Sequence, residues 1–317
     1  MYLTLADANS ARSASGSVIG KRLGNPKGRQ PRGRRSTAAA CQTWHDVPVI
    51  YRDQVPLLEF DSQTSAVVEP TSTQQEIVAP RAAVACFFPE IVSEWSDDAK
   101  PILDLPARER LWEIERGGAR LALFYPGMGA PLAASRLERV IAAGCRSIVA
   151  CGAAGALVPG LEMGHEIISV SAALRDEGTS YHYVPPSRII RARPDIVAAL
   201  AAMAERRGEP HRIGMTWTTD GYFRETQDRV ARRRAEGCIT VEMEAAALLA
   251  VAAFRDVQFG QYLYAGDDLA GEIWDHRNWW DSPRRHDLAE LAVDASLALA
   301  QNTLYQGLSE QESCRTT

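Results

Sequence analysis

The chain has 317 residues, of which 46% are hydrophobic and 24% are charged, which suits one large α/β domain or two small ones. Its net charge is −5, yet residues 1–40 hold eight Lys and Arg side chains against Asp7 alone, which leaves about −12 on residues 41–317. So acidic a body argues against nucleic-acid binding as the main function, and the lack of any run of about 18 apolar residues excludes a membrane span.

Both ends of the chain are expected to lie outside the folded domain. Residues 1–45 form a basic tail rich in Ser, Gly and Arg, a composition typical of disorder, and residues 311–317 are expected to be a flexible C-terminus. The pair Arg34 and Arg35 is not followed by the apolar segment that an export signal needs, so we expect a cytoplasmic protein. Residues 46–310 are predicted to form one domain.

The cysteine and histidine patterns indicate neither disulfides nor a metal site. The six cysteines show no CxxC or Cys/His spacing, and the six histidines show no HExxH pattern. A chain of this length does not need disulfides to stabilise its core. We therefore predict reduced thiols, most of them buried, and no metal.

Short apolar runs alternate with helical patterns in the rest of the chain. Strands are predicted at residues 82–88, 120–125, 146–151, 165–174, 211–219 and 259–266. Helices are predicted at residues 131–144, 195–208, 225–237, 238–254 and 288–301. The alternation predicts a single α/β domain with a central mixed β-sheet flanked by helices.

The segment CITVEMEAAALLAVAAF, residues 238–254, places Glu242 and Glu244 at the start of an uncharged run that is predicted to be a buried helix. A buried carboxylate needs hydrogen-bond donors, and the two hydroxyls of a ribose diol are suitable ones. The VEMEA motif resembles that of the nucleoside phosphorylase superfamily, which includes purine and uridine phosphorylases and nucleosidases. The similarity extends from roughly Phe60 to Leu299.

This resemblance implies a phosphorylase-like fold whose central sheet closes partly into a barrel. It also implies that Glu244 accepts the ribose hydroxyls, that Met243 packs against the sugar and the base, and that Glu242 belongs to the same ribose site. The family implies a homo-oligomer, from dimer to hexamer, acting on a small-molecule nucleoside.

The segment YLYAGDDLAGEIWDHR, residues 262–277, follows an apolar strand, where ligand chemistry gathers in α/β sheets. A carboxylic acid there can protonate the departing base, and the resemblance assigns this role to Asp267, with Arg277 orienting it. An acid at this position favours a purine. The base is expected to stack on Tyr222 or Phe223 in WTTDGYFRET, residues 217–226, with Gly152 also at the base.

The expected phosphate site departs from the family pattern. In ACGAAG, residues 150–155, Ala150 and Ala153 stand where the family has an arginine and a hydroxyl, and the turn FFPEIVSE, residues 87–94, contains neither Gly nor Arg. Gly129, the backbone of Ala153 and Arg175 are the phosphate ligands that the sequence still offers. Glu90 lies near the position where the nucleosidases carry a glutamate that activates water.

The sequence therefore predicts phosphorolysis of a nucleoside, with inorganic phosphate as co-substrate and no other cofactor. Three alternatives stay open. Glu90 could activate water, which would make the protein a phosphate-independent nucleoside hydrolase. The missing phosphate ligands also fit a nucleoside-binding homologue without catalysis. A nucleic-acid-binding protein that uses the basic tail is the third, and it predicts a steep dependence of affinity on salt.

Overall fold

The computed structural model describes residues 55–73, 77–161, 164, 166–271, 273–277 and 283–301. The predictions made for the basic tail and for residues 311–317 lie outside these ranges. Within them, no helix is long and apolar enough to cross a membrane. Four cysteines are buried free thiols, namely Cys86, Cys145, Cys151 and Cys238.

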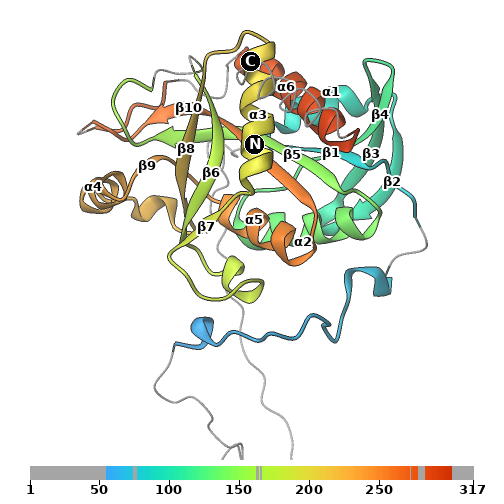
Figure 1. The fold of residues 1–317 in the computed structure, drawn as a ribbon, viewed down its shortest axis with the longest axis horizontal. Helices are drawn as coiled ribbons and strands as arrows, with labels where there is room; N and C mark the ends of the chain where they lie inside the picture. The colour runs from blue at the N-terminus through green and yellow to red at the C-terminus, as the bar shows by residue number, and fades with distance from the viewer. Residues whose placement is uncertain are drawn as a thin grey trace, which may run out of the picture. The chain divides into compact units, whose positions relative to one another are not determined.

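A ten-stranded mixed sheet forms the centre of the described part of the chain (Figure 1). Its strands are β1 (Ala82–Cys86), β2 (Lys100–Leu105), β3 (Glu109–Arg116), β4 (Ala119–Phe124), β5 (Ser147–Ala156), β6 (Ile167–Asp176), β7 (Ile189–Arg191), β8 (His211–Thr219), β9 (Cys238–Glu242) and β10 (Gln258–Asp268). Their order is β10-β6-β8-β9-β5-β1-β4-β3-β2, with β7 beside β6. Because β10 also pairs with β5, the strands β5, β10, β6, β8 and β9 close into a barrel.

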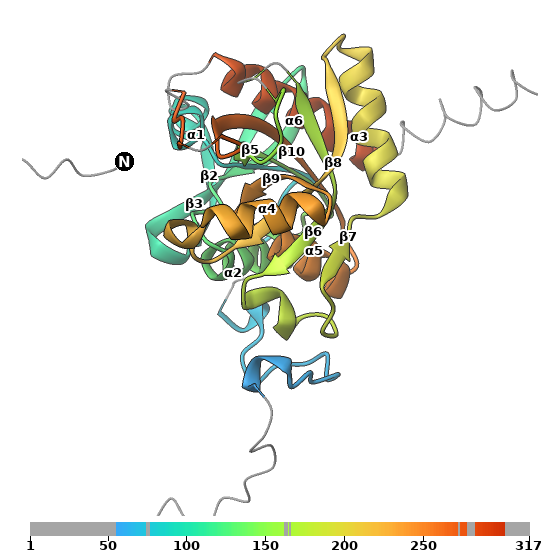
Figure 2. The ribbon, with the colours of Figure 1, turned by 90° about the vertical axis from the view of Figure 1, so that its left-hand side faces the viewer.

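Helices cover both faces of this sheet. They are α1 (Pro89–Ser96), α2 (Ala130–Ala142), α3 (Pro194–Arg206), α4 (Gln227–Ala235), α5 (Ala245–Phe254) and α6 (Arg284–Ala300), with short 3-10 helices η1 (Pro56–Leu58), η2 (Pro70–Thr73), η3 (Pro106–Arg108), η4 (Thr179–His182) and η5 (Tyr222–Arg224). Figure 2 shows α1 and α6 on one side of the strands and α2 and α5 on the other. Two core clusters correspond to these layers, one beneath α2 and α5 and one beneath α1, α3 and α6.

The local amino-acid sequence explains how individual strands and helices pack in this fold. All five residues of β1 are buried, as expected for a strand covered on both faces. Helix α5 contains only Ala, Leu and Val before its terminal Phe254, and eight of its ten residues are buried. A Cβ on Gly260 would lie 2.8 Å from Leu200 Cδ2, so glycine lets α3 pack closely on β10.

The predicted strands and helices are confirmed, with one correction and three omissions. One omission is helix α1, because residues 87–94 were interpreted as a turn. Residues 238–242 form strand β9, so the prediction of a single helix from 238 to 254 is wrong, and α5 begins only at Ala245. The physical reason is that the β-branched run of Ile239, Thr240 and Val241 favours a strand, whereas the uncharged Ala and Leu residues after it favour a buried helix. The β2–β3 hairpin and β7 were not predicted, because their partly exposed residues give no strong apolar run.

Candidate active site

Glu242 ends β9 and holds the start of α5. One carboxylate oxygen accepts the backbone N–H groups of Glu244 and Ala245 at 2.7 and 2.6 Å, and the other accepts the Thr218 hydroxyl at 2.6 Å. These bonds satisfy amides at the beginning of the helix that have no partner within it. They also account for the burial of Glu242, while its place in the ribose site stays a prediction.

Glu244 lies two residues further on, 7% exposed, and is directed to the start of α2. Its carboxylate accepts the backbone N–H of Gly129 at 2.5 Å. Gly129 has a φ of 93°, a conformation that favours glycine, and this amide is the one predicted to bind phosphate. Burial raises the pKa of Glu244, and the neighbouring charge of Glu242 raises it further. Met243 is half-buried between the two carboxylates.

Strand β5 runs between β9 and β10 and brings Asp267 beside Gly155. Gly155 pairs with Val241 of β9 and with Asp267 of β10. A Cβ on Gly155 would lie 2.4 Å from Leu269 Cδ1, 3.0 Å from Val241 Cγ1 and 3.3 Å from Asp267 Oδ1, so a glycine here leaves room chiefly for Leu269 and also for the carboxyl group. A Cβ on Gly152 would lie 3.2 Å from Phe87 Cβ. Its contact with a base stays a prediction.

Asp267 accepts the indole N–H of Trp274 at 2.7 Å. Burial raises the pKa of Asp267, which favours the protonated form that a general acid needs. Burial, together with the charge of Asp267, also raises the pKa of Glu225 to about 7. Sequence reasoning missed both Trp274 and Glu225. Trp274 lies in the same segment as Asp267, seven residues later, so its ring N–H could have been recognised as a hydrogen-bond donor to the acid. The sequence around Glu225 gives no comparable indication.

Arg277 does not hold Asp267. Its guanidinium donates to Asp268 Oδ2 at 2.5 Å and to the carbonyl of Leu161 at 2.7 Å. Arg277 fixes the neighbouring carboxylate of Asp268 instead, because adjacent residues at the end of a strand face opposite sides. That it orients the acid in the reaction stays a prediction. Its charge still acts on Asp267 and lowers the pKa of that group, against the larger effect of burial.

The predicted base platform lies in η5. The rings of Tyr222 and Phe223 contact each other with centroids 3.8 Å apart, and Phe223 is 84% exposed. The Trp274 side chain, which binds Asp267, is 60% exposed. Exposed aromatic rings are suited to stacking against a planar base, and of these three the Trp274 ring is the one in contact with the candidate acid.

Arg175 is buried near the end of β6 and reaches the loop that follows this strand. It donates to the hydroxyls of Ser180 and Ser187 at 2.8 and 2.9 Å and to the carbonyl of Pro185 at 2.8 Å, and it stacks over Tyr181. These contacts explain its burial as support for the loop. Its role as a phosphate ligand stays a prediction.

Glu90, at the start of α1, forms an ion pair with the buried Arg285 of α6. Arg285 also donates to the Tyr264 hydroxyl of β10 at 3.3 Å and lies over the Phe88 ring. Sequence reasoning missed Arg285 because 195 residues separate it from Glu90. Only the packing of α6 against β1 brings the two together.

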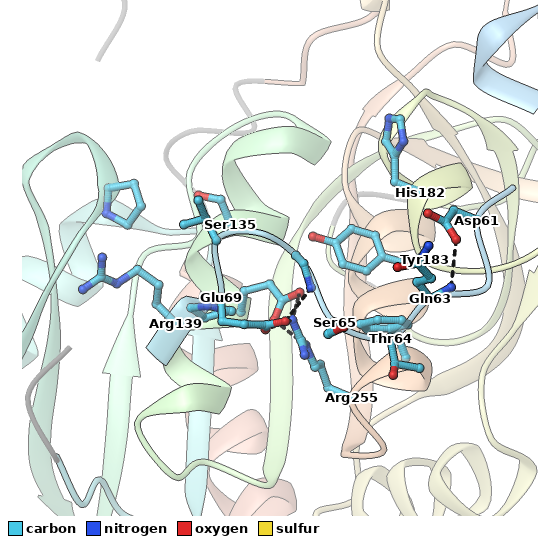
Figure 3. Close-up of a pocket in the computed structure, with 16 residues that line it drawn as sticks. Asp61, Gln63, Thr64, Ser65, Glu69, Ser135, Arg139, His182, Tyr183 and Arg255 are labelled. Carbon is cyan, nitrogen blue, oxygen red and sulfur yellow. Dashed lines mark hydrogen bonds and ion pairs between the residues drawn. The ribbon is translucent and has the colours of Figure 1, made fainter. Parts of the chain in front are cut away.

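A pocket of about 530 Å³ lies apart from these residues (Figure 3). Residues 61–70 fold over it, facing Ser135 and Arg139 of α2 and Tyr183 beside η4. An ion pair between Glu69 and Arg255 fastens this segment at 3.4 Å. None of the predicted site residues lines this pocket, so we do not assign the nucleoside to it.

Comparison with known proteins identifies the class that this fold and site define. Residues 81–303 match the family model of the phosphorylase superfamily. The chain belongs to this superfamily, as its VEMEA motif indicated.

Individual relatives include enzymes for different bases. A uridine phosphorylase from Thermococcus kodakarensis is 33% identical over 138 residues, which are 43% of this chain and 48% of that enzyme. A guanosine phosphorylase from Halorubrum lacusprofundi is 27% identical over 172 residues, 53% of this chain and 69% of that enzyme. The chain thus matches about half the length of the Thermococcus enzyme.

Solved structures share the fold. A purine nucleoside phosphorylase from Toxoplasma gondii, in complex with immucillin-H, superimposes with a TM-score of 0.62 at 16% identity, covering 73% of this chain and 99% of that one. A uridine phosphorylase from Vibrio fischeri gives a TM-score of 0.60 at 18% identity, covering 71% and 98%. The phosphorylase-like fold predicted from the sequence is confirmed.

Proposed function

We propose that the protein cleaves the N-glycosidic bond of a nucleoside by phosphorolysis. The observation that carries the proposal is Glu244, a buried carboxylate whose contact with Gly129 joins the start of α5 to the start of α2. Two vicinal hydroxyls offset the cost of burying its charge, since each donates a hydrogen bond to the ionised form. The names of the relatives, which are phosphorylases of uridine and guanosine, support the same reaction.

The reaction needs a proton donor at the base, and we assign that role to Asp267. An oxygen of hydrogenphosphate forms a bond to C1′ of the ribose as the bond from C1′ to the base nitrogen breaks. The electron pair of that bond goes to the base, Asp267 donates the proton, and the proton of hydrogenphosphate restores Asp267. The products are ribose 1-phosphate and the free base.

We propose a purine as the base. A carboxylic acid can donate to a ring nitrogen of a departing purine, and the raised pKa of Asp267 supports a protonated acid before the bond breaks. The exposed Phe223 and Tyr222 are the proposed stacking surface. Incubating the protein with a panel of purine and pyrimidine nucleosides, with and without phosphate, tests base and co-substrate together. Release of uracil or thymine alone would contradict the purine proposal.

Substitution of the two central carboxylates separates their roles. We expect Asp267→Asn to lower kcat by about 100-fold or more, because it removes the proton donor. We expect Glu244→Ala to act chiefly on the KM for the nucleoside. Asp228→Asn, an exposed change in the first turn of α4, is the control. Unchanged kinetics in both variants would refute the assignment.

Hydrolysis is the second candidate, because two of the predicted phosphate ligands already have protein partners. The Gly129 amide binds Glu244, and the Arg175 guanidinium holds its own loop. In this alternative Glu90 activates water. Appearance of free ribose in phosphate-free buffer would favour it, whereas ribose 1-phosphate formed only with phosphate supports phosphorolysis.

We also propose a homo-oligomer. Large apolar side chains near the candidate site are exposed, among them Met128 at 59% and Ile273 at 83%. Burial of such side chains against a second copy would remove apolar area from water. Light scattering coupled to size-exclusion chromatography tests this, and a monomer mass at micromolar concentration would contradict it.

A further inference from the structure

An arginine and a tyrosine hydroxyl lie together at the carboxyl end of β1. Arg285 enters from α6, is 7% exposed, and donates from Nε to the Tyr264 hydroxyl at 3.3 Å. Its guanidinium lies 5.1 Å from the centre of the Phe88 ring, directly after β1, and the rings of Phe88 and Tyr264 are 6.1 Å apart. A buried arginine fixed by such contacts is a pre-organised donor for an oxyanion.

This pair borders the middle of the candidate site. Tyr264 of β10 is the direct neighbour of Ala153 of β5, and adjacent residues of parallel strands share a face of the sheet. Ala153 is half-buried and supplies no polar side-chain atom, whereas its register partner Tyr264 carries a hydroxyl.

Tyr125 links this region to the proposed ribose site. It follows β4, in the loop that also contains Gly129, whose amide binds Glu244. Burial raises the pKa of Tyr125, and the charges of both Glu244 and Glu90 contribute, so Tyr125 lies within electrostatic reach of both carboxylates.

Glu90 is the residue that makes this arrangement responsive to a ligand. It forms an ion pair with Arg285, but its side chain is 49% exposed while that of Arg285 is 8% exposed. An exposed carboxylate can rotate into water at little cost, whereas the arginine is held by its surroundings. An entering anion therefore replaces Glu90 as the partner of a fixed cation.

We propose that Arg285 and the Tyr264 hydroxyl bind a phosphate oxyanion and that Glu90 is the resting counter-ion which the phosphate displaces. The proposal rests on the proposed function. It also names a cationic residue that binds the phosphate, which the sequence did not identify. The phosphate is either the inorganic co-substrate or the 5′-phosphate of a nucleotide, and the two sources differ experimentally.

The test measures the KM for inorganic phosphate during nucleoside cleavage, and separately the binding of inorganic phosphate by calorimetry. We expect Arg285→Gln to weaken both by roughly 10- to 100-fold, and Tyr264→Phe by roughly 3- to 10-fold. Glu90→Gln should act in the opposite direction and lower the KM for phosphate, because it removes a competing negative charge. The KM for the nucleoside should change little in all three.

Arg284→Gln is the matched control, since Arg284 is the preceding residue of the same helix and forms its own ion pairs with Glu209 and Asp287. Arg285→Lys keeps the charge and should give an intermediate KM for phosphate. It replaces Arg285→Gln in the test if the glutamine variant proves unstable in a thermal melt. The same calorimetry with a nucleoside 5′-monophosphate, compared with its nucleoside, identifies the source. Loss of affinity for the monophosphate alone in Arg285→Gln assigns the pair to the 5′-phosphate.

The outcomes separate this inference from the proposed function. Phosphate-dependent base release in which Arg285→Gln and Arg285→Lys change neither the KM for inorganic phosphate nor the affinity for the nucleoside 5′-monophosphate overturns the inference and leaves phosphorolysis standing. Base release without phosphate that disappears in Glu90→Gln overturns both in favour of hydrolysis. If no nucleoside is cleaved, the proposed function fails, and phosphate binding that depends on Arg285 still supports the inference.

Discussion

Burial and one hydrogen bond act in opposite directions on the pKa of Asp267. Burial favours its neutral form, while the hydrogen bond from the Trp274 indole favours its ionised form. Burial is the larger effect, so the pKa is raised overall. The indole thereby orients the acid while its pKa stays above the ordinary value.

Substitution of the indole isolates this effect. We expect Trp274→Phe to raise the pKa of Asp267, because the donor that stabilises the carboxylate is lost. The decline of kcat/KM at high pH should then move to higher pH, while kcat at its optimum falls only a few-fold. Trp112→Phe, in β3 away from the acid, is the control. A pH profile identical to that of the unmodified protein would contradict the role of Trp274.

At the scale of elements, the junction of β8, β9 and α5 is stabilised by one buried network. Thr218 of β8 donates to Glu242 and accepts the backbone N–H of Ala246 at 3.0 Å. Glu242 accepts two further amides at the start of α5. This network fixes where the helix begins and hence where Glu244 is directed.

Removal of the Thr218 hydroxyl takes one hydrogen-bond partner from the buried carboxylate of Glu242 and one from the backbone N–H of Ala246. We expect Thr218→Val, which keeps the shape, to lower the free energy of unfolding by about 1–3 kcal/mol. Denaturant unfolding measures it. Thr226→Val is the control, because Thr226 precedes α4 without a side-chain capping bond and should change stability by less than about 0.5 kcal/mol. Equal stability of both variants would argue against the network.

Over the whole molecule, buried carboxyl groups give stability an unusual dependence on pH. Burial raises the pKa of five of them, namely Glu177, Glu225, Glu242, Glu244 and Asp267. A raised pKa means that the folded state binds protons more tightly than the unfolded state. The stability that this contributes is fully present below the ordinary carboxyl pKa and is lost as pH rises through the raised values, about 7 for Glu225.

We therefore expect the melting temperature of the ligand-free protein to fall between pH 6 and pH 9. Glu244→Gln should reduce this fall and gain roughly 1 kcal/mol at the alkaline end, since each pKa unit corresponds to about 1.4 kcal/mol. Glu205→Gln, an exposed change in α3, is the control. A melting temperature that rises over this range, or an equal slope in Glu244→Gln, would contradict the account.

The sequence alone determined which segments enter the core and which family the chain belongs to, and it proposed which motif carries the chemistry. Buried strands such as β1 and the 148–151 part of β5 are continuous apolar runs, so local pattern is sufficient to place them. The motif around Glu244 and the acid at Asp267 are also local features. The division of labour between Glu242 and Glu244 is not, because it depends on which distant donors reach each side chain.

Those donors were decided by the tertiary structure. Gly129 reaches Glu244 across 115 residues, Thr218 reaches Glu242 across 24, and Arg285 reaches Glu90 across 195. The periodicity of a sequence indicates which face of its strand or helix a residue lies on. Which residues of different strands come together depends on the pairing of β5 with both β9 and β10. For the same reason Arg175 was indistinguishable in sequence from a phosphate ligand, and only its contacts within the loop after β6 revealed a structural role.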